Sequence, residues 1–234
     1  NSVAPAWPEL ELPGAHSDIG GGYLPQLRED LYLTRPQVET LPLSKPGTAS
    51  RVYQQALAQL EELAHTPAIM SITHSHTVSP EVWEDDYAPA DRYSQPQKRT
   101  FAALTLRHRT VRYDWAKVVL RVMVDAATEA GAVFMDMEKM IEHRMPEELK
   151  PFCERARRMG KAVRQHTTPS GFAPEEVDMI ASNYIHCSAH WNAVQLNLSG
   201  ELQGGASASE TVSFVNRPDT NWRRTIYAMD GKKR

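Results

Sequence analysis

The chain has little cysteine, no long hydrophobic run and no large excess of one charge. Two cysteines among 234 residues, Cys153 and Cys187, are too few for a disulfide framework, and we expect two buried thiols rather than one bridge. The most apolar stretch, Val118–Val124, contains Arg121 and is far shorter than the roughly 18 residues that span a bilayer. A formal net charge of -3 and a pI of about 6.3 give no reason to expect nucleic-acid binding.

The beginning of the chain lacks the pattern of a secretion signal. Glu9 and Glu11 fall where the apolar core of a signal peptide would lie, so we expect none. Leu10 and Leu12 alternate with these glutamates, which predicts the end of a strand. The chain begins at Asn1 rather than at a methionine and enters this strand at once, which predicts processing or truncation of a longer polypeptide.

The composition, with 41% hydrophobic and 24% charged residues, is typical of a globular protein with a core. The clearest periodicity predicts a helix over 114–130. Trp115 and Met123 fall on its apolar face and Arg121 on its polar face, and Asp114 is the expected N-cap. This stripe indicates core packing rather than a cofactor site.

The rest of the pattern predicts a helix-rich chain with a few strands at both ends. Three further helices are expected, at 50–64, 147–165 and 174–185. We expect an extended proline-rich connection over 24–46, a surface loop over 77–98, and a strand or helical turn over 101–106. A period of two around Leu196 and again around Val212 and Phe214, separated by a Gly/Ala/Ser-rich stretch, predicts a hairpin.

The most informative motif follows the opening strand: Pro-Gly-Ala-His-Ser-Asp-Ile-Gly-Gly-Gly-Tyr, at 13–23. In hydrolases built on a doubly wound sheet, the catalytic histidine lies on a loop after a late strand, which makes His16 a candidate general base. The alternative is a histidine that only hydrogen-bonds a turn. Asp18 could orient His16, cap a helix or bind a cation. Gly20, Gly21 and Gly22 could form an anion-binding nest or let the loop pass beneath a helix.

A nucleophile for His16 is not found in the sequence. No Gly-x-Ser-x-Gly occurs, and Ser170 and Ser199 lack the flanking glycine of a strand-to-helix elbow. If His16 is the base of a serine hydrolase, the nucleophile and the acid must precede Asn1.

A second group of reactive side chains lies at 184–191. His186 and His190 would face the same way on a helix and could bind a metal, but a helix end packed by Tyr184 and Trp191 is favoured. His74 and His76 would share one face of a strand, which is a weak indication of metal binding. A metal enzyme that uses His16, Asp18 and His186 is an alternative function. We expect no metal and no cofactor.

Basic residues cluster within the helix expected at 147–165. They are Arg155, Arg157, Arg158, Lys161 and Arg164. Such a face could contact anionic lipid. A solvated helix face, balanced by glutamates near its start, is the favoured interpretation.

The 13–23 loop resembles the signature loop of a family of α/β-hydrolase proteins. That family includes the first class of type VI secretion lipase effectors, which are antibacterial phospholipases. Looser similarities are the 115–131 helix, Tyr184-Ile185-His186-x-Ser188, and Asn216-Arg217-Pro218 followed by Arg224-Thr225-Ile226-Tyr227. Together these motifs span nearly the whole chain.

The resemblance implies an α/β fold and a Ser-Asp-His triad that attacks lipid esters, with His16 as its base. The nucleophile and acid would lie upstream, so this chain would be the C-terminal half of the enzyme. Residues 1–46 would supply the last core strand, the histidine loop and a connection; 47–192 would cover the site; 193–234 would form a hairpin and tail. Asp18, Gly20, Gly21, Gly22 and His186 would lie near the site without an assigned role.

The resemblance also implies partners and a location. Membrane phospholipids would be the substrate, and a secretion-spike protein, an immunity protein and the upstream half of the polypeptide would be partners. Such a protein is bacterial, made in the cytoplasm and delivered to the periplasm of a target cell. The alternative is a non-catalytic module that binds membrane or another protein.

Overall fold

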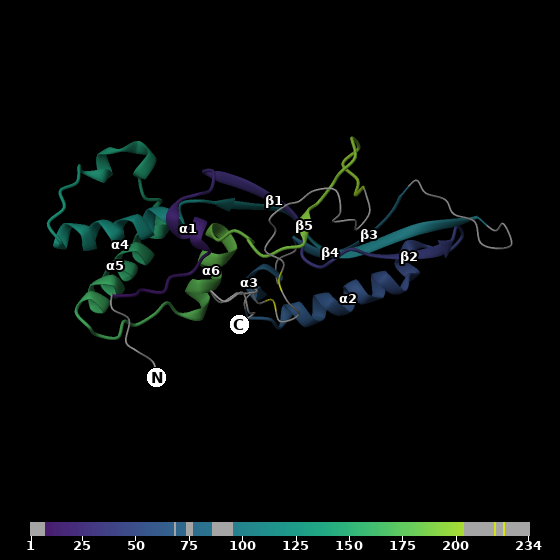
Figure 1. Cartoon of the computed structure of the whole chain (residues 1–234), viewed down its shortest axis with the longest axis horizontal. Coiled ribbons are helices and arrows are strands. Elements are labelled where there is room, and N and C mark those ends of the chain that lie inside the picture. Colours follow the sequence, from purple (N-terminus) through teal and green to yellow (C-terminus); the bar gives the residue numbers. More distant parts are fainter. Residues whose placement is uncertain are drawn as a thin grey trace, which may run out of the picture. The chain divides into compact units, whose positions relative to one another are not determined.

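The chain divides into two units, each built from segments far apart in the sequence. The computed structural model describes residues 8–67, 69–73, 77–85, 96–203, 218 and 222. The first unit, here called the helical unit, comprises Asn1–Leu27 and Thr110–His186. The second, the sheet unit, comprises Arg28–Arg109 and Cys187–Arg234 (Figure 1). The three-segment division expected from the sequence stays a prediction.

The helical unit packs four α-helices around one apolar core. They are α1 (His16–Gly20), α4 (Trp115–Glu129), α5 (Lys150–Arg164) and α6 (Pro174–Tyr184). Short 3₁₀ turns lie at Met137–Lys139, Ile141–His143 and Glu147–Leu149. Figure 1 shows α4 and α5 side by side, and they pack directly on each other. Trp115, Leu149 and Ile180 have no exposed surface, so the core lies between α4, α5 and α6.

The helix predicted over 114–130 is confirmed, but two side chains exchange faces. Met123 is 61% exposed, whereas Arg121 is buried. The Arg121 guanidinium donates hydrogen bonds to the carbonyl oxygens of Lys117 (3.1 Å) and His143 (2.9 Å), which compensates its burial. Asp114 precedes α4 without capping it through its side chain, and pairs instead with Lys117 at 2.8 Å.

The other expected helices are also confirmed. The helices at 147–165 and 174–185 correspond to α5, with the turn before it, and to α6. The helix after Ser50 is α2 (Arg51–Ala64), in the sheet unit. The Ser50 hydroxyl accepts a hydrogen bond from the Tyr53 N–H at 3.1 Å, as an N-cap does. Both cysteines are free and buried, as expected.

The sheet unit contains a five-stranded sheet with α2 packed on it. Its strands are β1 (Gln26–Tyr32), β2 (Gln37–Pro42), β3 (Val78–Glu84), β4 (Gln97–Arg112) and β5 (Asn192–Ala193). The order is β2-β4-β1-β5, and β3 also pairs with β4. The pairs β2–β4, β3–β4 and β1–β5 are antiparallel, with Val38 opposite Phe101 and Val82 opposite Ala102. Helix α2 packs on β2 and β3, and the short α3 (Met70–Thr73) packs on α2.

Several strand predictions were wrong. Residues 8–12 form no strand, although Leu10 and Leu12 pack on the core of the helical unit. The supposed connection over 24–46 contains β1 and β2, and the supposed loop over 77–98 contains β3. The segment 101–106 is strand, inside β4.

The expected hairpin near the end is only partly described. Leu196 bridges Leu202 in an antiparallel sense, so the first alternating segment turns back on itself immediately. The second segment, around Val212 and Phe214, lies outside the described residues. The described fold thus mixes helices with an antiparallel sheet, which is consistent with an α/β class. No helix in the described ranges has the length and apolar character needed to cross a membrane.

Candidate functional site

The predicted histidine loop forms the short helix α1 and the turns around it. His16 is the first residue of α1, and its side chain is exposed. Asp18 Oδ2 accepts a hydrogen bond from the Ala15 N–H at 2.9 Å, and so closes the first turn from within. Gly21 ends the helix with φ of 76°, a left-handed conformation that glycine adopts without strain. His16 therefore begins a short helix whose start is closed by Asp18 and whose end is closed at Gly21.

Asp18 and His186 form a buried pair in the helical unit. Both are at most 4% exposed. Asp18 Oδ1 accepts hydrogen bonds from His186 Nδ1 at 2.7 Å and from the His186 backbone N–H at 3.1 Å. This bond assigns the ring proton to Nδ1. The Tyr23 ring stacks on the imidazole, with centroids 3.6 Å apart. Two residues that the sequence only placed near the site are thus in direct contact.

The contacts of Asp18 distinguish between the roles that the sequence left open for it. Its two oxygens are engaged by Ala15 and His186, so Asp18 organises the backbone before His16 rather than binding the His16 ring. His186 Nε2 is buried and has no hydrogen-bond partner among the described residues. A general base must reach a reacting proton. The exposed ring of His16 is accessible from outside the unit, whereas the ring of His186 is enclosed.

Two further contacts fix the turn on the core. The indole Nε1–H of Trp115 donates a hydrogen bond to the Pro13 carbonyl oxygen at 2.8 Å. Gly14 has φ of +120°, and a Cβ there would lie 2.9 Å from Asp18 Cβ, so only glycine fits. Ile19 packs on the core of the helical unit. The sequence predicted the turn at Pro13-Gly14 but none of these contacts.

The three glycines after α1 have different surroundings. A Cβ added at Gly20 would meet nothing within 4 Å, whereas one at Gly22 would lie 3.2 Å from Ser17 Cβ. The Gly22 N–H donates to the Ser17 carbonyl oxygen at 2.9 Å. Gly21 and Gly22 thus fold the chain back on α1.

Tyr184 fixes the end of α6 two residues before His186. Its hydroxyl donates to Glu148 Oε1 at 3.1 Å and accepts a hydrogen bond from Arg112, which also binds Glu148 at 2.6 Å. Burial raises the pKa of Tyr184 to about 12, so its hydroxyl stays protonated at neutral pH. Because α6 ends at Tyr184, His186 and His190 do not share a helix, which removes the helical metal pair, the alternative that the sequence did not favour.

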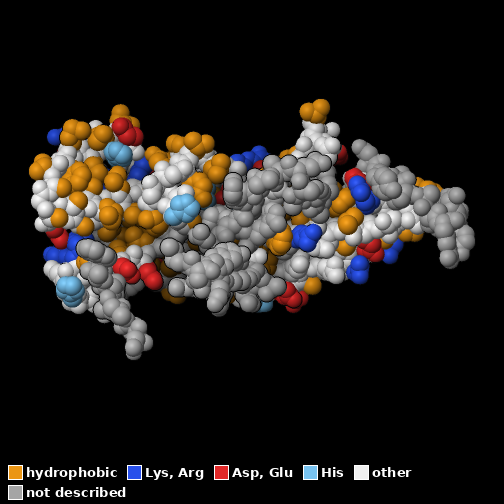
Figure 2. All heavy atoms as spheres, viewed as in Figure 1, with side chains coloured by type: hydrophobic (Ala, Val, Ile, Leu, Met, Phe, Trp, Pro, Cys, Tyr) orange, Lys and Arg blue, Asp and Glu red, His pale blue; other side chains and the backbone are white. Residues whose placement is uncertain are grey.

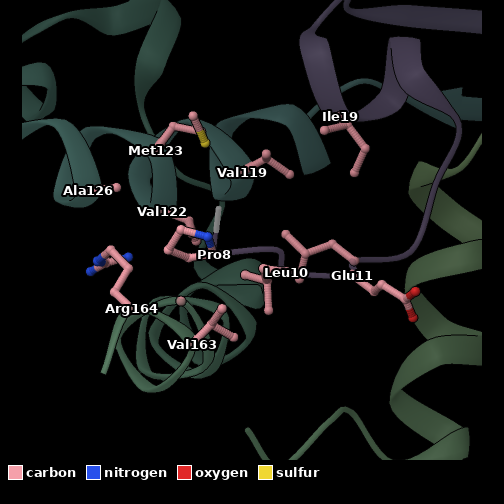
Figure 3. A pocket seen from close by; sticks show the side chains of 12 residues that line it. Pro8, Leu10, Glu11, Ile19, Val119, Val122, Met123, Ala126, Val163 and Arg164 are labelled. Atoms are coloured by element: carbon pink, nitrogen blue, oxygen red, sulfur yellow. The ribbon is translucent and has the colours of Figure 1, made fainter. Parts of the chain in front are cut away.

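An apolar groove of about 620 Å³ lies in the helical unit beside α1 (Figure 3). Its walls come from residues 8–12, from α4 and from α5, and Ile19 of α1 contributes to it. Val119, Val122, Met123 and Val163 give it a hydrocarbon lining. Hydrophobic side chains also gather over this part of the molecule in Figure 2. Ile19 is the residue of α1 among the lining residues, and His16 begins the same short helix three residues earlier without lining the groove itself.

The basic cluster on α5 is largely neutralised. Arg157 makes a bidentate contact with Asp125 at 2.7 and 2.8 Å, and Arg164 makes one with Glu129 at the same two distances. Arg155 pairs with Glu176. Three of the five basic residues are thus paired with carboxylates, which favours the interpretation of α5 as a packed and solvated helix.

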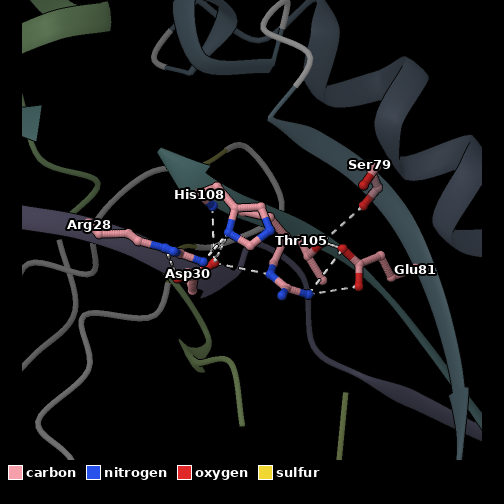
Figure 4. A network of polar contacts seen from close by, with 7 residues as sticks. Arg28, Asp30, Ser79, Glu81, Thr105 and His108 are labelled. Carbon is pink, nitrogen blue, oxygen red and sulfur yellow. Dashed lines mark hydrogen bonds and ion pairs between the residues drawn. The ribbon is translucent and has the colours of Figure 1, made fainter. Parts of the chain in front are cut away.

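The sheet unit holds a polar network of its own (Figure 4). Asp30 accepts hydrogen bonds from the His108 N–H (3.0 Å) and from Arg107 (3.1 Å) on one oxygen, and from Arg28 (2.9 Å) on the other. Burial would raise the pKa of Asp30, but these hydrogen bonds outweigh it and the pKa lies below its usual value. Arg107 also binds both oxygens of Glu81. The carboxylates are fully engaged, which indicates a structural role.

Other predicted sites have little support. Within the ranges given above, no group of three or more His, Cys, Asp or Glu side chains is arranged to hold a metal ion. His74 and His76 lie outside the described residues, as do Asn216, Arg217 and 224–227.

Comparison with known proteins identifies the family. The solved Tle1 effector, bound to the VgrG spike of the type 6 secretion system, matches 96% of this chain with 34% sequence identity and a TM-score of 0.78. This chain belongs to the Tle1 effector family. It spans less than half, 46%, of the Tle1 chain that it matches. No family model and no curated protein matches it.

Proposed function

We propose that this chain is the histidine-bearing part of a lipid-ester hydrolase, a phospholipase of the Tle1 family. The observation that carries the proposal is His16, an exposed imidazole on a capped and anchored turn beside an apolar groove. Membership of a family of secreted effectors supports the same activity. On this proposal the serine and the acid of the triad belong to polypeptide preceding Asn1, because no nucleophile elbow occurs in this sequence.

His16 would act twice in the reaction. The serine Oγ attacks the ester carbonyl carbon, His16 accepts the Oγ proton and then delivers it to the departing alcohol oxygen. Water next attacks the acyl-enzyme, His16 accepts its proton and returns one to Oγ, and the fatty acid leaves. Backbone N–H groups elsewhere in the intact site would stabilise the oxyanion.

The groove would receive an acyl chain of the substrate. Its hydrocarbon lining favours a lipid tail, since each buried methylene contributes about 0.8 kcal/mol. Glu11 and Arg164 are its charged lining residues. Membrane phospholipid is therefore the proposed substrate class.

The proposed setting follows from the family. Because the matched Tle1 effector is bound to a VgrG spike, we propose a spike protein as the delivery partner. Delivery into the periplasm of a target bacterium, and an immunity protein in the producing cell, are parts of the same proposal.

His16→Ala in the native gene product that contains this chain tests the function. The expected result is a loss of kcat of about 10³-fold or more on p-nitrophenyl butyrate and on phospholipid vesicles. His65→Ala, which removes another exposed histidine, is the matched control and retains full activity. Near-normal turnover by His16→Ala would refute the assignment.

A serine-reactive fluorophosphonate probe separates the enzyme from a non-catalytic module. Labelling of a serine upstream of Asn1 is expected, and the rate of labelling should fall in His16→Ala. Folded protein that takes up no label would favour a binding module.

A further inference from the structure

The position of His16 depends on a carboxylate two residues further along α1. Asp18 Oδ2 accepts a hydrogen bond from the N–H of Ala15, the residue directly before His16. Asp18 Oδ1 accepts hydrogen bonds from both the ring Nδ1–H and the backbone N–H of His186. The two halves of this contact are 168 residues apart in sequence. One buried side chain therefore ties the start of α1 to the segment that follows α6.

His186 is built as a fixed donor. Its Nδ1–H points at Asp18, Tyr23 covers one face of its ring, and its Nε2 is enclosed. Tyr184, held by Arg112 and Glu148, anchors the backbone two residues before it. A buried carboxylate is stable only when its oxygens are hydrogen-bonded. If the His186 ring donor is lost, the Asp18 carboxylate must reorient toward another hydrogen-bond donor, and its hydrogen bond to the Ala15 N–H changes in geometry.

We propose that Asp18 and His186 are positioning residues that aim His16 at the reacting proton, acting through the capped first turn of α1. This inference rests on the proposed function of His16 as general base. It assigns a role to His186, for which the resemblance implied only proximity, and selects one of the roles that the sequence left open for Asp18. Misplacing a catalytic group by about 1 Å costs about 10²-fold in rate, so a small change in this turn has a measurable effect.

Four variants of the native gene product test the proposal on p-nitrophenyl butyrate. His186→Asn keeps an N–H donor near the Nδ1 position, whereas His186→Gln moves it to the Nε2 position and His186→Leu removes it. Asp18→Asn puts an amide N–H where a carboxylate oxygen accepts. We expect His186→Leu, His186→Gln and Asp18→Asn each to lower kcat by about 10- to 100-fold while KM stays within about twofold of wild type. The kcat of His186→Asn should stay within about threefold of wild type.

Two comparisons separate positioning from mere stability. Ile180→Val removes a methyl group from the same core without touching the pair, and it should lower the unfolding midpoint while kcat is unchanged. If His186→Leu does not fold, the contrast between His186→Asn and His186→Gln decides the result.

Equal kcat for His186→Asn and His186→Gln, or full kcat for Asp18→Asn, would overturn the inference. The proposed function would still stand in that case if His16→Ala were inactive. An active His16→Ala would instead sink the proposed function.

Discussion

A methyl group added at Gly160 has no free space on the side of α5 that faces α4. A Cβ built there lies 2.8 Å from Val122 Cγ1 and 3.1 Å from Arg164 Nη1. Overpacking of this kind costs about 2 kcal/mol, while replacing glycine by alanine inside a helix contributes about 1 kcal/mol in return. Gly160→Ala should therefore lower the free energy of unfolding by about 1 kcal/mol.

The measurement is urea unfolding followed by the circular dichroism of the helices. Gly20→Ala is the matched control, because a Cβ at Gly20 meets nothing within 4 Å and should cost no stability. Val122→Ala should be destabilising alone, yet combined with Gly160→Ala it should recover about 1 kcal/mol or more relative to additivity. Stabilisation by Gly160→Ala, or strict additivity of the two changes, would refute the packing argument.

Three other features lead to tests of stability and reactivity. The pKa of Asp30 is below its ordinary value of 3.8 in the folded state, so the network adds stability above that pH and loses it as the pH falls through the lowered pKa. The stability gap between wild type and Asp30→Asn should accordingly be constant above about pH 5 and close in acid. Burial raises the pKa of the Cys187 thiol to about 12, so neither it nor the buried Cys153 should react with a thiol-specific dye until the protein unfolds, and rapid labelling of native protein would contradict this. Ser50→Ala should cost about 1 kcal/mol through loss of the α2 cap, whereas Ser50→Thr should cost less; equal losses would argue against capping.

Helices could be predicted from the sequence because their signals are local. The 3.6-residue spacing that predicts α4 lies within a segment of fifteen residues. The N-cap contact of α2 joins Ser50 to Tyr53, within four residues. The exchange of Arg121 and Met123 shows the limit of that rule. Whether a guanidinium is buried depends on carbonyl groups such as that of His143, which only the folded chain brings close.

Strands were harder to predict because their stability is not local. β2 and β3 are short, each contains or ends at a proline, and both gain their order by pairing with β4. The stretch over 77–98 predicts a loop because it is rich in Pro, Asp and Tyr, yet β3 within it pairs with β4. In contrast, residues 8–12 show clean alternation but have no strand pairing in the described chain.

In the candidate site, too, the local features could be predicted from the sequence and the long-range contact could not. The turn around His16 could be read from Pro13-Gly14 and the glycines that follow, since these residues favour particular backbone angles. The contact between Asp18 and His186 could not, because nothing in either segment specifies the other. Motif similarity placed His186 near the site, and the folded chain supplied its partner.

The stacking of Tyr23 on His186 gives this site a built-in spectroscopic reporter. With the two rings 3.6 Å apart and only 18° from parallel, the aromatic ring current should displace the carbon-bound imidazole protons to high field. Among the nine histidines of the chain, that signal would single out one resonance. Because the same ring bonds to Asp18, its chemical shift would report whether this contact is intact, in solution and without any substrate.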